Sequence, residues 1–292
     1  MSHAKGVGIG GYADSSEDFL YSRYNHYAPL SFEREVKKLE TLRYFPQHVG
    51  TYDGSLPINF IIQTEISWFT KLSSWRLLGD YTVTDKATKV APLASDEWSL
   101  ANNFPHTLFT SVACVLNDLK IVDSGSNSYP YKSYLENILS HPEWYEKKIM
   151  SADNFHRDTK QFSHTLMDVD ANEPQLDTND GYKKRKEGLI NGGAKEFCVP
   201  IHNDLVTATR DLQPGYRLEF KFLRRGPGVD TFSIIQPKSN NKEYIIHLNN
   251  LRITVDKVLL VDKLFNHYYN NMKKGAQIPI TRNKVAYSIL IL

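Results

Sequence analysis

The sequence predicts a mostly β protein, and two observations support this prediction. Tyr (17) and Phe (14) far outnumber Met (4) among the 292 residues, and aromatic residues reach 12%. This bias favours pleated, half-buried sheets over helical bundles. Short runs rich in β-branched and aromatic residues also recur between clusters of Gly, Asp and Ser, as strands do between turns. The length allows one large β domain or two smaller ones.

Residues 1–50 are predicted to form an N-terminal arm with one short amphipathic helix. The GVGIGG stretch lacks the preceding strand that a phosphate-binding loop requires, so residues 1–27 are expected to be a flexible arm. After Ser31 the apolar residues fall near helical spacing, and Pro46 ends the run. These apolar residues are Phe32, Val36, Leu39 and Leu42.

Local signals predict strands in the first half of the next segment, residues 51–236. The stretch 56–85 predicts two or three strands, because aromatic and β-branched residues recur between Gly, Asp and Ser. The stretch NNFPHTLFTSVACVLND follows. A turn or helical entry is expected around residues 103–108, and then a hairpin with Asn117 and Asp118 at its tip.

The second half of this segment combines one helix, a long connection and further strands. YPYKSYLENIL predicts a helix that ends at His141, before Pro142. Residues 151–193 are polar and are expected to be a long connection at one end of a sandwich. Strands then resume in EFCVPIHNDLV and YRLEFKFLRR, around the turn LQPG, and in FSIIQ. The apolar residues on one face of the helix are Tyr134, Leu135, Ile138 and Leu139.

The C-terminal segment, residues 237–292, predicts two strands with a helix between them. YIIHLNNLRITVDKV and VAYSILIL have the composition of strands. Lys273, Lys274 and Gly275 suit the end of the helix. Its apolar residues recur every fourth position, at Leu260, Leu264, Tyr268 and Met272.

Charge and cysteine content argue against several classes of function. The net charge is +2 and the pI about 8.3, too near balance for the basic surface of a dedicated nucleic-acid binder. The one basic run, Lys183–Lys186, is expected to be a solvated loop. Cys114 and Cys198 lie too far apart for a zinc knuckle or disulfide framework and are predicted to be buried thiols. No signal for secretion or a membrane span occurs, so intracellular synthesis fits best.

His106 lies between two phenylalanines, and its local neighbours are Asn102 and Asn103 rather than Asp or Glu. A catalytic or metal-binding histidine needs a charged or metal-binding neighbour. His106 is therefore expected to be a hydrogen-bonded structural residue. His202 and Asp204 are the best acid-base pair in the sequence, but no third residue is apparent to complete a catalytic site.

Two further patterns fail as functional motifs, and a third stays open. DVDANE places Asp168, Asp170 and Asn172 at calcium-loop spacing, but Glu173 replaces the required glycine and Asn179 the required glutamate. No Gly-x-Ser-x-Gly motif marks a hydrolase nucleophile, and SGSNS at residues 124–128 is a loop. Trp68, Trp75, Trp98 and Trp144 could stack on sugars in a lectin-like protein, although burial in a core or subunit contact is the plainer interpretation.

Four motifs in order resemble one protein family. They are NNFPHTLFTSVACVLNDLKI, SNSYPYKSYLENIL, CVPIHNDLVTATRDLQPGYRLEFKFLRR and YIIHLNNLRITVDKVLLVDKLF. Together they resemble the major capsid protein of Maverick/Polinton transposon-viruses and adintoviruses, from about Leu56 onward. The residues that carry the resemblance most directly are Asn102, Asn103, His106, Leu108, Phe109, Leu116, Asn117 and Tyr129 to Glu136.

The resemblance implies an all-β double jelly roll. Residues 51–236 would be the first jelly roll, with a few short helices, and residues 237–292 would resemble the start of a second. The chain would then be a fragment, a domesticated genomic copy or a shorter relative. The resemblance places no catalytic, cofactor-binding or metal-binding role on any residue.

The expected function is that of a viral structural protein without enzymatic activity. It would associate with itself, as a trimeric capsomer, and with other capsid proteins in the virion, without a membrane span or specific nucleic acid. A carbohydrate- or receptor-binding jelly-roll module is the first alternative. A penton-type single jelly-roll capsid protein is the second, and an enzyme ranks below these.

Overall fold

The fold is described from a computed structural model. The described residues are 36–48, 52, 56–123, 127–141, 145, 149–158, 179–206, 208, 211–225, 232–236 and 241–272. Residues 1–35 of the predicted N-terminal arm, residues 168–173 of the calcium-like loop and the predicted strand VAYSILIL lie outside this part of the chain.

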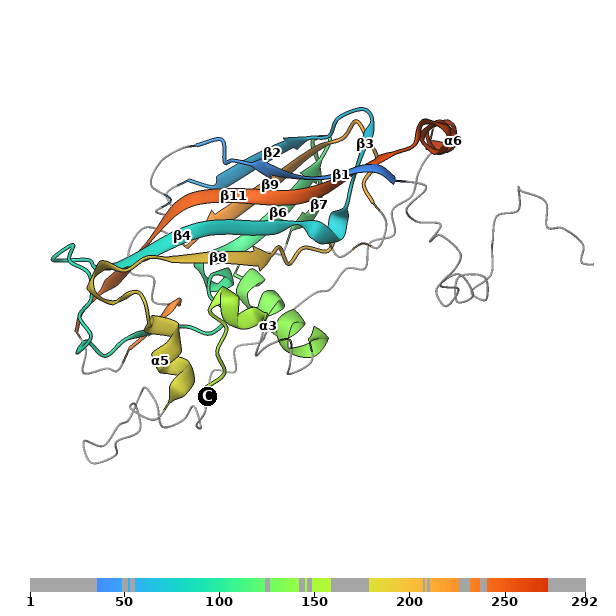
Figure 1. The fold of residues 1–292 in the computed structure, drawn as a ribbon. Coiled ribbons are helices and arrows are strands. Elements are labelled where there is room, and N and C mark those ends of the chain that lie inside the picture. The colour runs from blue at the N-terminus through green and yellow to red at the C-terminus, as the bar shows by residue number, and fades with distance from the viewer. Residues whose placement is uncertain are drawn as a thin grey trace, which may run out of the picture.

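Two antiparallel sheets contain the eight long strands of the described part (Figure 1). The first sheet has the order β1-β11-β4-β8, and the short strand β3 pairs with β11 beyond this path. The second has the order β2-β9-β6-β7. The strands of the first sheet are β1 (Val36–Tyr44), β3 (Trp68–Thr70), β4 (Arg76–Asp85), β8 (Lys195–Pro200) and β11 (Tyr244–Leu260); those of the second are β2 (Ile58–Gln63), β6 (Phe109–Leu116), β7 (Leu119–Asp123) and β9 (Arg217–Arg224).

The order in which the chain visits the two sheets is that of a jelly roll. Counted along the chain, the first sheet contains the first, eighth, third and sixth long strands, and the second contains the second, seventh, fourth and fifth. Only the fourth and fifth, β6 and β7, are consecutive neighbours, and they form a hairpin. This winding of eight strands into two sheets defines the jelly roll. The predicted all-β jelly-roll class is confirmed.

Aromatic side chains fill the space between the two sheets. Trp75, just before β4, packs against Phe220 of β9 with ring centroids 5.1 Å apart. Phe60 of β2 and Phe222 of β9 meet edge to face at 5.7 Å. All four are almost completely buried. Such pairs add about 0.5–1.5 kcal/mol each beyond the burial of their area, so the aromatic bias of the sequence is used in the core.

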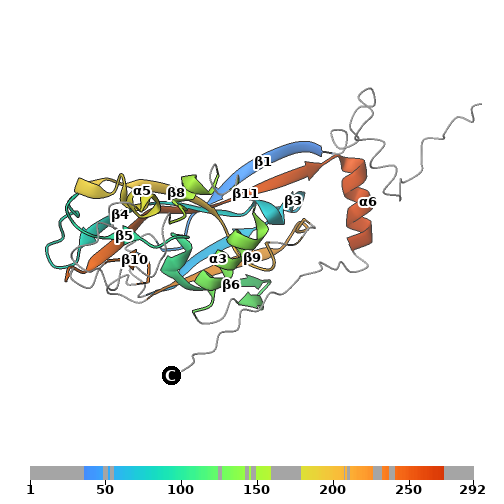
Figure 2. The same cartoon turned by 90° about the horizontal axis from the view of Figure 1, so that it is seen from below.

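Helices and short strands lie outside this sandwich (Figures 1 and 2). Helix α3 lies next to β6 and η2, and α6 lies at the end of the sandwich, where Phe265 and Tyr268 contact Phe69 of β3. The helices are η1 (Leu72–Ser74), η2 (His106–Leu108), α3 (Tyr129–Ser140), η3 (Met150–Asp153), α5 (Asp180–Lys186), η6 (Ile190–Gly192) and α6 (Asp262–Met272). The remaining strands, β5 (Ser99–Leu100) and β10 (Ile234–Ile235), pair with each other.

Several predicted elements are confirmed. The stretch 56–85 contains three strands, and the helices predicted from YPYKSYLENIL and around Leu264 are α3 and α6. At the tip of the β6-β7 hairpin, Asn117 and Asp118 have φ values of 46° and 67°. Left-handed values at both central residues are what a tight two-residue hairpin requires. The helical entry expected around residues 103–108 is η2.

The amphipathic helix predicted before Pro46 is wrong, because Val36–Tyr44 is strand β1. This strand pairs antiparallel with β11 along its length, from Val36 opposite Leu260 to Tyr44 opposite Ile253. Leu39, assigned to the helix face, is 61% exposed. Pairing with a distant strand has overridden a weak local pattern.

The domain limits predicted at residues 50/51 and 236/237 need the same correction. Strand β11 lies between β1 and β4 in the first sheet, so it completes this jelly roll rather than beginning another. The jelly roll therefore includes both β1 and β11 and extends over residues 36–260.

The basic run is also different from its prediction. Lys183–Lys186 belongs to helix α5, and Asn179 caps this helix by accepting a hydrogen bond from the Tyr182 amide. Arg185 is 1% exposed. Its guanidinium donates to the carbonyl oxygens of Leu100 and His156 and to Asp158.

Candidate functional site

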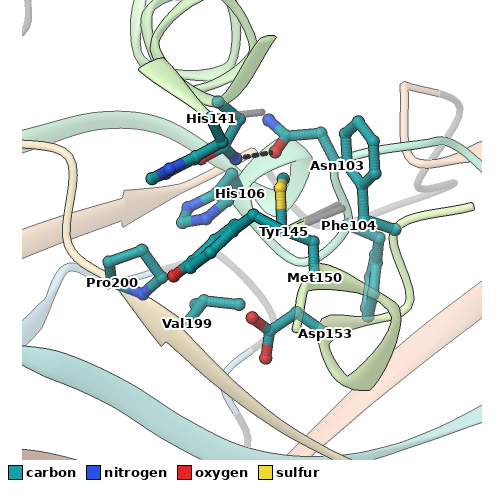
Figure 3. Close-up of a pocket in the computed structure, with 11 residues that line it drawn as sticks. Asn103, Phe104, His106, His141, Tyr145, Met150, Asp153, Val199 and Pro200 are labelled. Atoms are coloured by element: carbon teal, nitrogen blue, oxygen red, sulfur yellow. Dashed lines mark hydrogen bonds between the residues drawn. The ribbon is translucent and has the colours of Figure 1, made fainter. Parts of the chain in front are cut away.

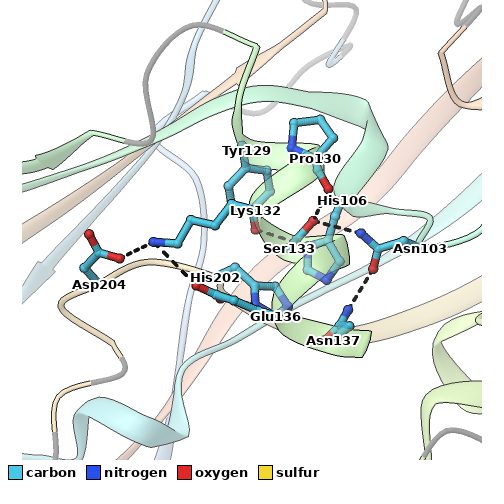
Figure 4. A network of polar contacts seen from close by, with 10 residues as sticks. All are labelled: Asn103, His106, Tyr129, Pro130, Lys132, Ser133, Glu136, Asn137, His202 and Asp204. Atoms are coloured by element: carbon cyan, nitrogen blue, oxygen red, sulfur yellow. Dashed lines mark hydrogen bonds and ion pairs between the residues drawn. The ribbon is translucent and has the colours of Figure 1, made fainter. Parts of the chain in front are cut away.

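Helix α3 turns a polar face toward the sandwich (Figure 4). Spacing of i, i+3, i+4, i+7 and i+8 defines one face of a helix, and the residues with this spacing from Tyr129 are Lys132, Ser133, Glu136 and Asn137. All but Glu136 are buried, and the Glu136 side chain is 20% exposed. The apolar residues predicted on one face lie elsewhere: Leu135 is 44% and Leu139 is 80% exposed.

His106 joins η2 to this face. Its Nδ1 lies 3.1 Å from the Tyr129 hydroxyl, and its ring meets the ring of His202 edge to face, with centroids 4.7 Å apart. His106 and His202 are 3% and 7% exposed. Burial, together with the neighbouring His202, holds the pKa of His106 well below its ordinary range, because the charged imidazole loses its hydration here.

Ion pairs continue this cluster toward Asp204. The Lys132 ammonium donates to the Asp204 carboxylate and lies 3.7 Å from Oε1 of Glu136. The second carboxylate oxygen of Glu136 lies 2.7 Å from Nδ1 of His202. Lys132 and Asp204 are both buried. Charges removed from water in this way are tolerated only when they are paired and hydrogen-bonded.

Amide and hydroxyl groups complete the contact on the other side of the helix. The side-chain amide nitrogen of Asn137 donates to the side-chain oxygen of Asn103 at 2.7 Å. The side-chain nitrogen of Asn103 donates to the Ser133 hydroxyl at 2.8 Å. Ser133 in turn donates to the main-chain carbonyl of Pro130. Because these bonds join Asn103, Ser133 and Asn137 in one chain, they hold α3 in one position.

A small cavity lies beside His106 (Figure 3). Its volume is about 20 Å³, which holds about one water molecule and no organic substrate. Asp153 lines it, and burial raises the pKa of this carboxyl to about 6, although the Cys198 amide donates to it. The other lining residues are Asn103, Phe104, His106, Asn137, His141, Tyr145, Met150, Phe155, Val199 and Pro200.

Three of the sequence candidates, His106, His202 and Asp204, lie in this cluster, but with partners that the sequence did not indicate. His106 is buried and hydrogen-bonded as predicted, but its partner is the distant Tyr129 rather than Asn102 or Asn103. His202 and Asp204 do not form the predicted acid-base pair. His202 is hydrogen-bonded to Glu136, and Asp204 is hydrogen-bonded to Lys132. The spacing of polar residues in α3 was the only local signal for this cluster.

The remaining candidates are the two cysteines, the four tryptophans and the calcium-like residues. Cys114 is buried as predicted, whereas Cys198 is half-buried. Trp75 and Trp98 are buried in the core and cannot stack on a sugar, while Trp68 is partly exposed. Trp144 and the calcium-like residues Asp168 to Glu173 fall outside the described part.

The described residues contain neither a metal-binding cluster nor a membrane-spanning helix. No group of three or more His, Cys, Asp or Glu side chains in these ranges is arranged to hold a metal ion. Within the same ranges, no helix has the length and apolar character to cross a bilayer. The expectation that the chain uses no metal, cofactor or catalytic residue stays a prediction.

Comparison with known proteins gives matches among solved structures alone. No protein-family model and no curated protein matches the chain. A structure of the Sputnik virophage aligns with a TM-score of 0.49 and 12% identity over 90% of this chain and 55% of that one. The Faustovirus major capsid protein gives 0.45 and 10% over 85% and 58%. The mavirus major capsid protein gives 0.38 and 10% over 89% and 54%. The chain spans a little over half the length of each.

Proposed function

We propose that this chain is a structural protein of a viral shell, and that its molecular role is self-association without catalysis. More specifically, we propose a major capsid protein of the Maverick/Polinton and adintovirus type, because four sequence motifs resemble that family. Its partners would be further copies, as trimeric capsomers, and other capsid proteins. It would be made inside the host cell and end in the virion.

One observation carries the proposal: the segments that resemble this family converge on the same buried cluster. Asn103 and His106 come from the first motif, the polar face of α3 from the second, and His202 and Asp204 from the third. They bond to one another and hold a helix on a jelly roll. Residues that bond to one another in this way serve the construction of the fold, which favours a structural role over an active site.

The fold itself is compatible with more than one function, because jelly rolls form viral capsid, lectin and cupin domains. A lectin would need accessible aromatic rings. Of the three Trp candidates that the structure describes, Trp75 and Trp98 are buried in the core. Among these three, the carbohydrate-binding alternative therefore rests on Trp68, which is partly exposed on the short strand β3.

The test is the oligomeric state of the purified chain, measured by size exclusion with light scattering over a range of micromolar concentrations. Trimers or larger closed assemblies, seen as discrete particles by electron microscopy, are the expected result. Pentamers would favour the penton-type alternative. A stable monomer at high micromolar concentration would contradict the proposal.

A glycan array with the same preparation tests the carbohydrate-binding alternative. Binding that is lost in Trp68→Ala and kept in Trp75→Phe, a conservative change in the core, would favour a lectin. Absence of binding in an assembling chain agrees with the capsid proposal.

A further inference from the structure

We propose that His106 and His202, here called the histidine pair, form an acid-sensitive contact that holds helix α3 on the sandwich at neutral pH and releases it on protonation. The pair lies where η2, α3 and the segment after β8 meet (Figure 4). Protonation of both rings would place two positive charges 4.7 Å apart, centroid to centroid, in a site removed from water. Like charges at that distance repel strongly in a buried site.

The hydrogen bond between His106 and Tyr129 specifies the neutral form. The Tyr129 hydroxyl lies 3.1 Å from Nδ1 of His106, and its O–H can donate to this nitrogen. A neutral ring with its proton on Nε2 accepts this bond. Protonation of Nδ1 removes the acceptor, and the Tyr129 O–H must find another inside the core or stay unpaired, at a cost.

The neighbouring charges can balance one added proton but not two. Glu136 faces His202 and can neutralise a charge there. The same carboxylate is shared with Lys132, which also binds Asp204. A second positive charge, on His106, has no carboxylate partner of its own among the residues that the structure describes. The titratable or charged groups around the pair are Tyr129, Lys132 and Glu136 of α3, His141 at its end, Asp204 after β8, Asp153 of η3 and Tyr145.

The direction of the effect follows from which state binds more protons. His106 has a lowered pKa in the folded chain, whereas in an opened chain its pKa would be about 6.5. Its contribution to stability is therefore fully present above about pH 6.5 and is lost as the pH falls below that value. Asp153 acts with the opposite sign. Its pKa is raised to about 6, so the folded chain takes up a proton there and gains stability in acid.

A consequence for assembly rests on the proposed function. If the chain builds a shell, release of α3 in acid would change the surface of every subunit at once. The contact itself can be tested on the unassembled chain, so the two proposals can fail independently.

Hydrogen exchange of the full chain at several pH values from 7.5 to 4.5, corrected for intrinsic exchange rates, tests the contact. The expected result is that protection of α3 begins to fall below about pH 6.5, by at most tenfold per pH unit, the slope for one excess proton. Below about pH 6 the proton taken up by Asp153 offsets part of this fall. Strand β11 should stay protected over the same range. In His106→Gln, which carries no titratable ring, the α3 slope should flatten.

Two further variants serve as controls. His247→Gln is the matched control, because His247 lies on β11, outside the cluster, with its ring bonded to Thr84; its α3 slope should equal that of the wild type. Asp153→Asn removes the opposing titration and should steepen the slope. If α3 in His106→Gln is already unprotected at pH 7.5, His202→Gln replaces it as the test variant. Its α3 slope should also flatten, because His202 no longer helps to lower the pKa of His106.

The proposal is overturned if α3 protection in Asp153→Asn, which lacks the opposing titration, is unchanged between pH 7.5 and 4.5. It is equally overturned if the variants of both histidines keep the wild-type slope, or if β11 loses protection together with α3. Light scattering at each pH separates this outcome from the capsid proposal. Acid release of α3 in a chain that never assembles supports the contact and refutes the shell, and assembly without acid release does the reverse.

Discussion

Lys132→Met removes the one cation of α3 that pairs with Asp204, in the segment after β8. The two side chains are similar in length, so the change deletes a charge more than it deletes volume. The side chains of Lys132 and Asp204 are 5% and 7% exposed. After the substitution, the Asp204 carboxylate loses its ammonium partner, and Glu136 loses the nearby ammonium while its contact with His202 remains.

The expected cost is about 3–5 kcal/mol in the free energy of unfolding, the range for breaking one side of a buried ion pair. This is a large share of the 5–15 kcal/mol that typical domains possess. Removing the second charge should recover part of it. The double variant Lys132→Met with Asp204→Asn should therefore be more stable than Lys132→Met alone, with a coupling energy of about 0.5–3 kcal/mol.

Urea unfolding at neutral pH, followed by tryptophan fluorescence, measures these differences. Lys86→Met is the matched control, because Lys86 pairs with Glu243 at 2.9 Å on the surface, with both side chains about half exposed. Its cost should stay below about 1 kcal/mol. The reasoning is refuted if Lys132→Met costs no more than this control, or if the effects of the two single substitutions simply add in the double variant.

Three further predictions concern the fold and can be checked by thermal unfolding. Asn117→Val places a β-branched residue at φ 46° and should cost about 1–3 kcal/mol, whereas an unchanged midpoint would mean that the hairpin tip is not strained. Arg185→Lys cannot reproduce three guanidinium hydrogen bonds of 2.6–2.8 Å and should cost about 3 kcal/mol or more; a loss below 1 kcal/mol would show that these bonds contribute little. Gly79→Ala brings a methyl group to 2.7 Å from Leu251 and 3.0 Å from Phe197, and overpacking of about 1–3 kcal/mol is expected. A neutral Gly79→Ala would mean that both neighbours can move aside.

Much of the fold could be predicted because its signals are local. The Asn-Asp pair predicted the hairpin tip, the every-fourth apolar spacing predicted α6, and alternating aromatic and β-branched residues predicted most strands. Strand β1 could not be predicted in this way. Its burial alternates only near its end, at Glu40, Leu42 and Tyr44, and its partner lies at the opposite end of the sandwich sequence.

The buried cluster was harder to predict, because its bonds join residues far apart in the chain. His106 and Tyr129 are 23 positions apart, while Glu136 and His202 are 66 and Lys132 and Asp204 are 72. Hydrophobic periodicity assumes that the apolar side of a helix is the buried one. In α3 the polar side is buried, since η2 and the segment after β8 supply complementary groups. The spacing of polar residues in α3 was a local signal, but only contacts with distant segments decide which side of the helix is buried.

Strand β11 has a consequence for the kinetics of folding. It hydrogen-bonds to β1 along one side and to β4 along the other, and one of its side-chain contacts, between Thr41 and Asp256, joins residues 215 positions apart. Contacts of such long range are slow to form, because a long loop must close before they contribute any stability. Until β11 arrives, β1 and β4 have no partner between them and expose strand edges to other chains. Refolding yield should therefore depend steeply on protein concentration, and the newly made chain should need protection from aggregation until residue 260 has emerged.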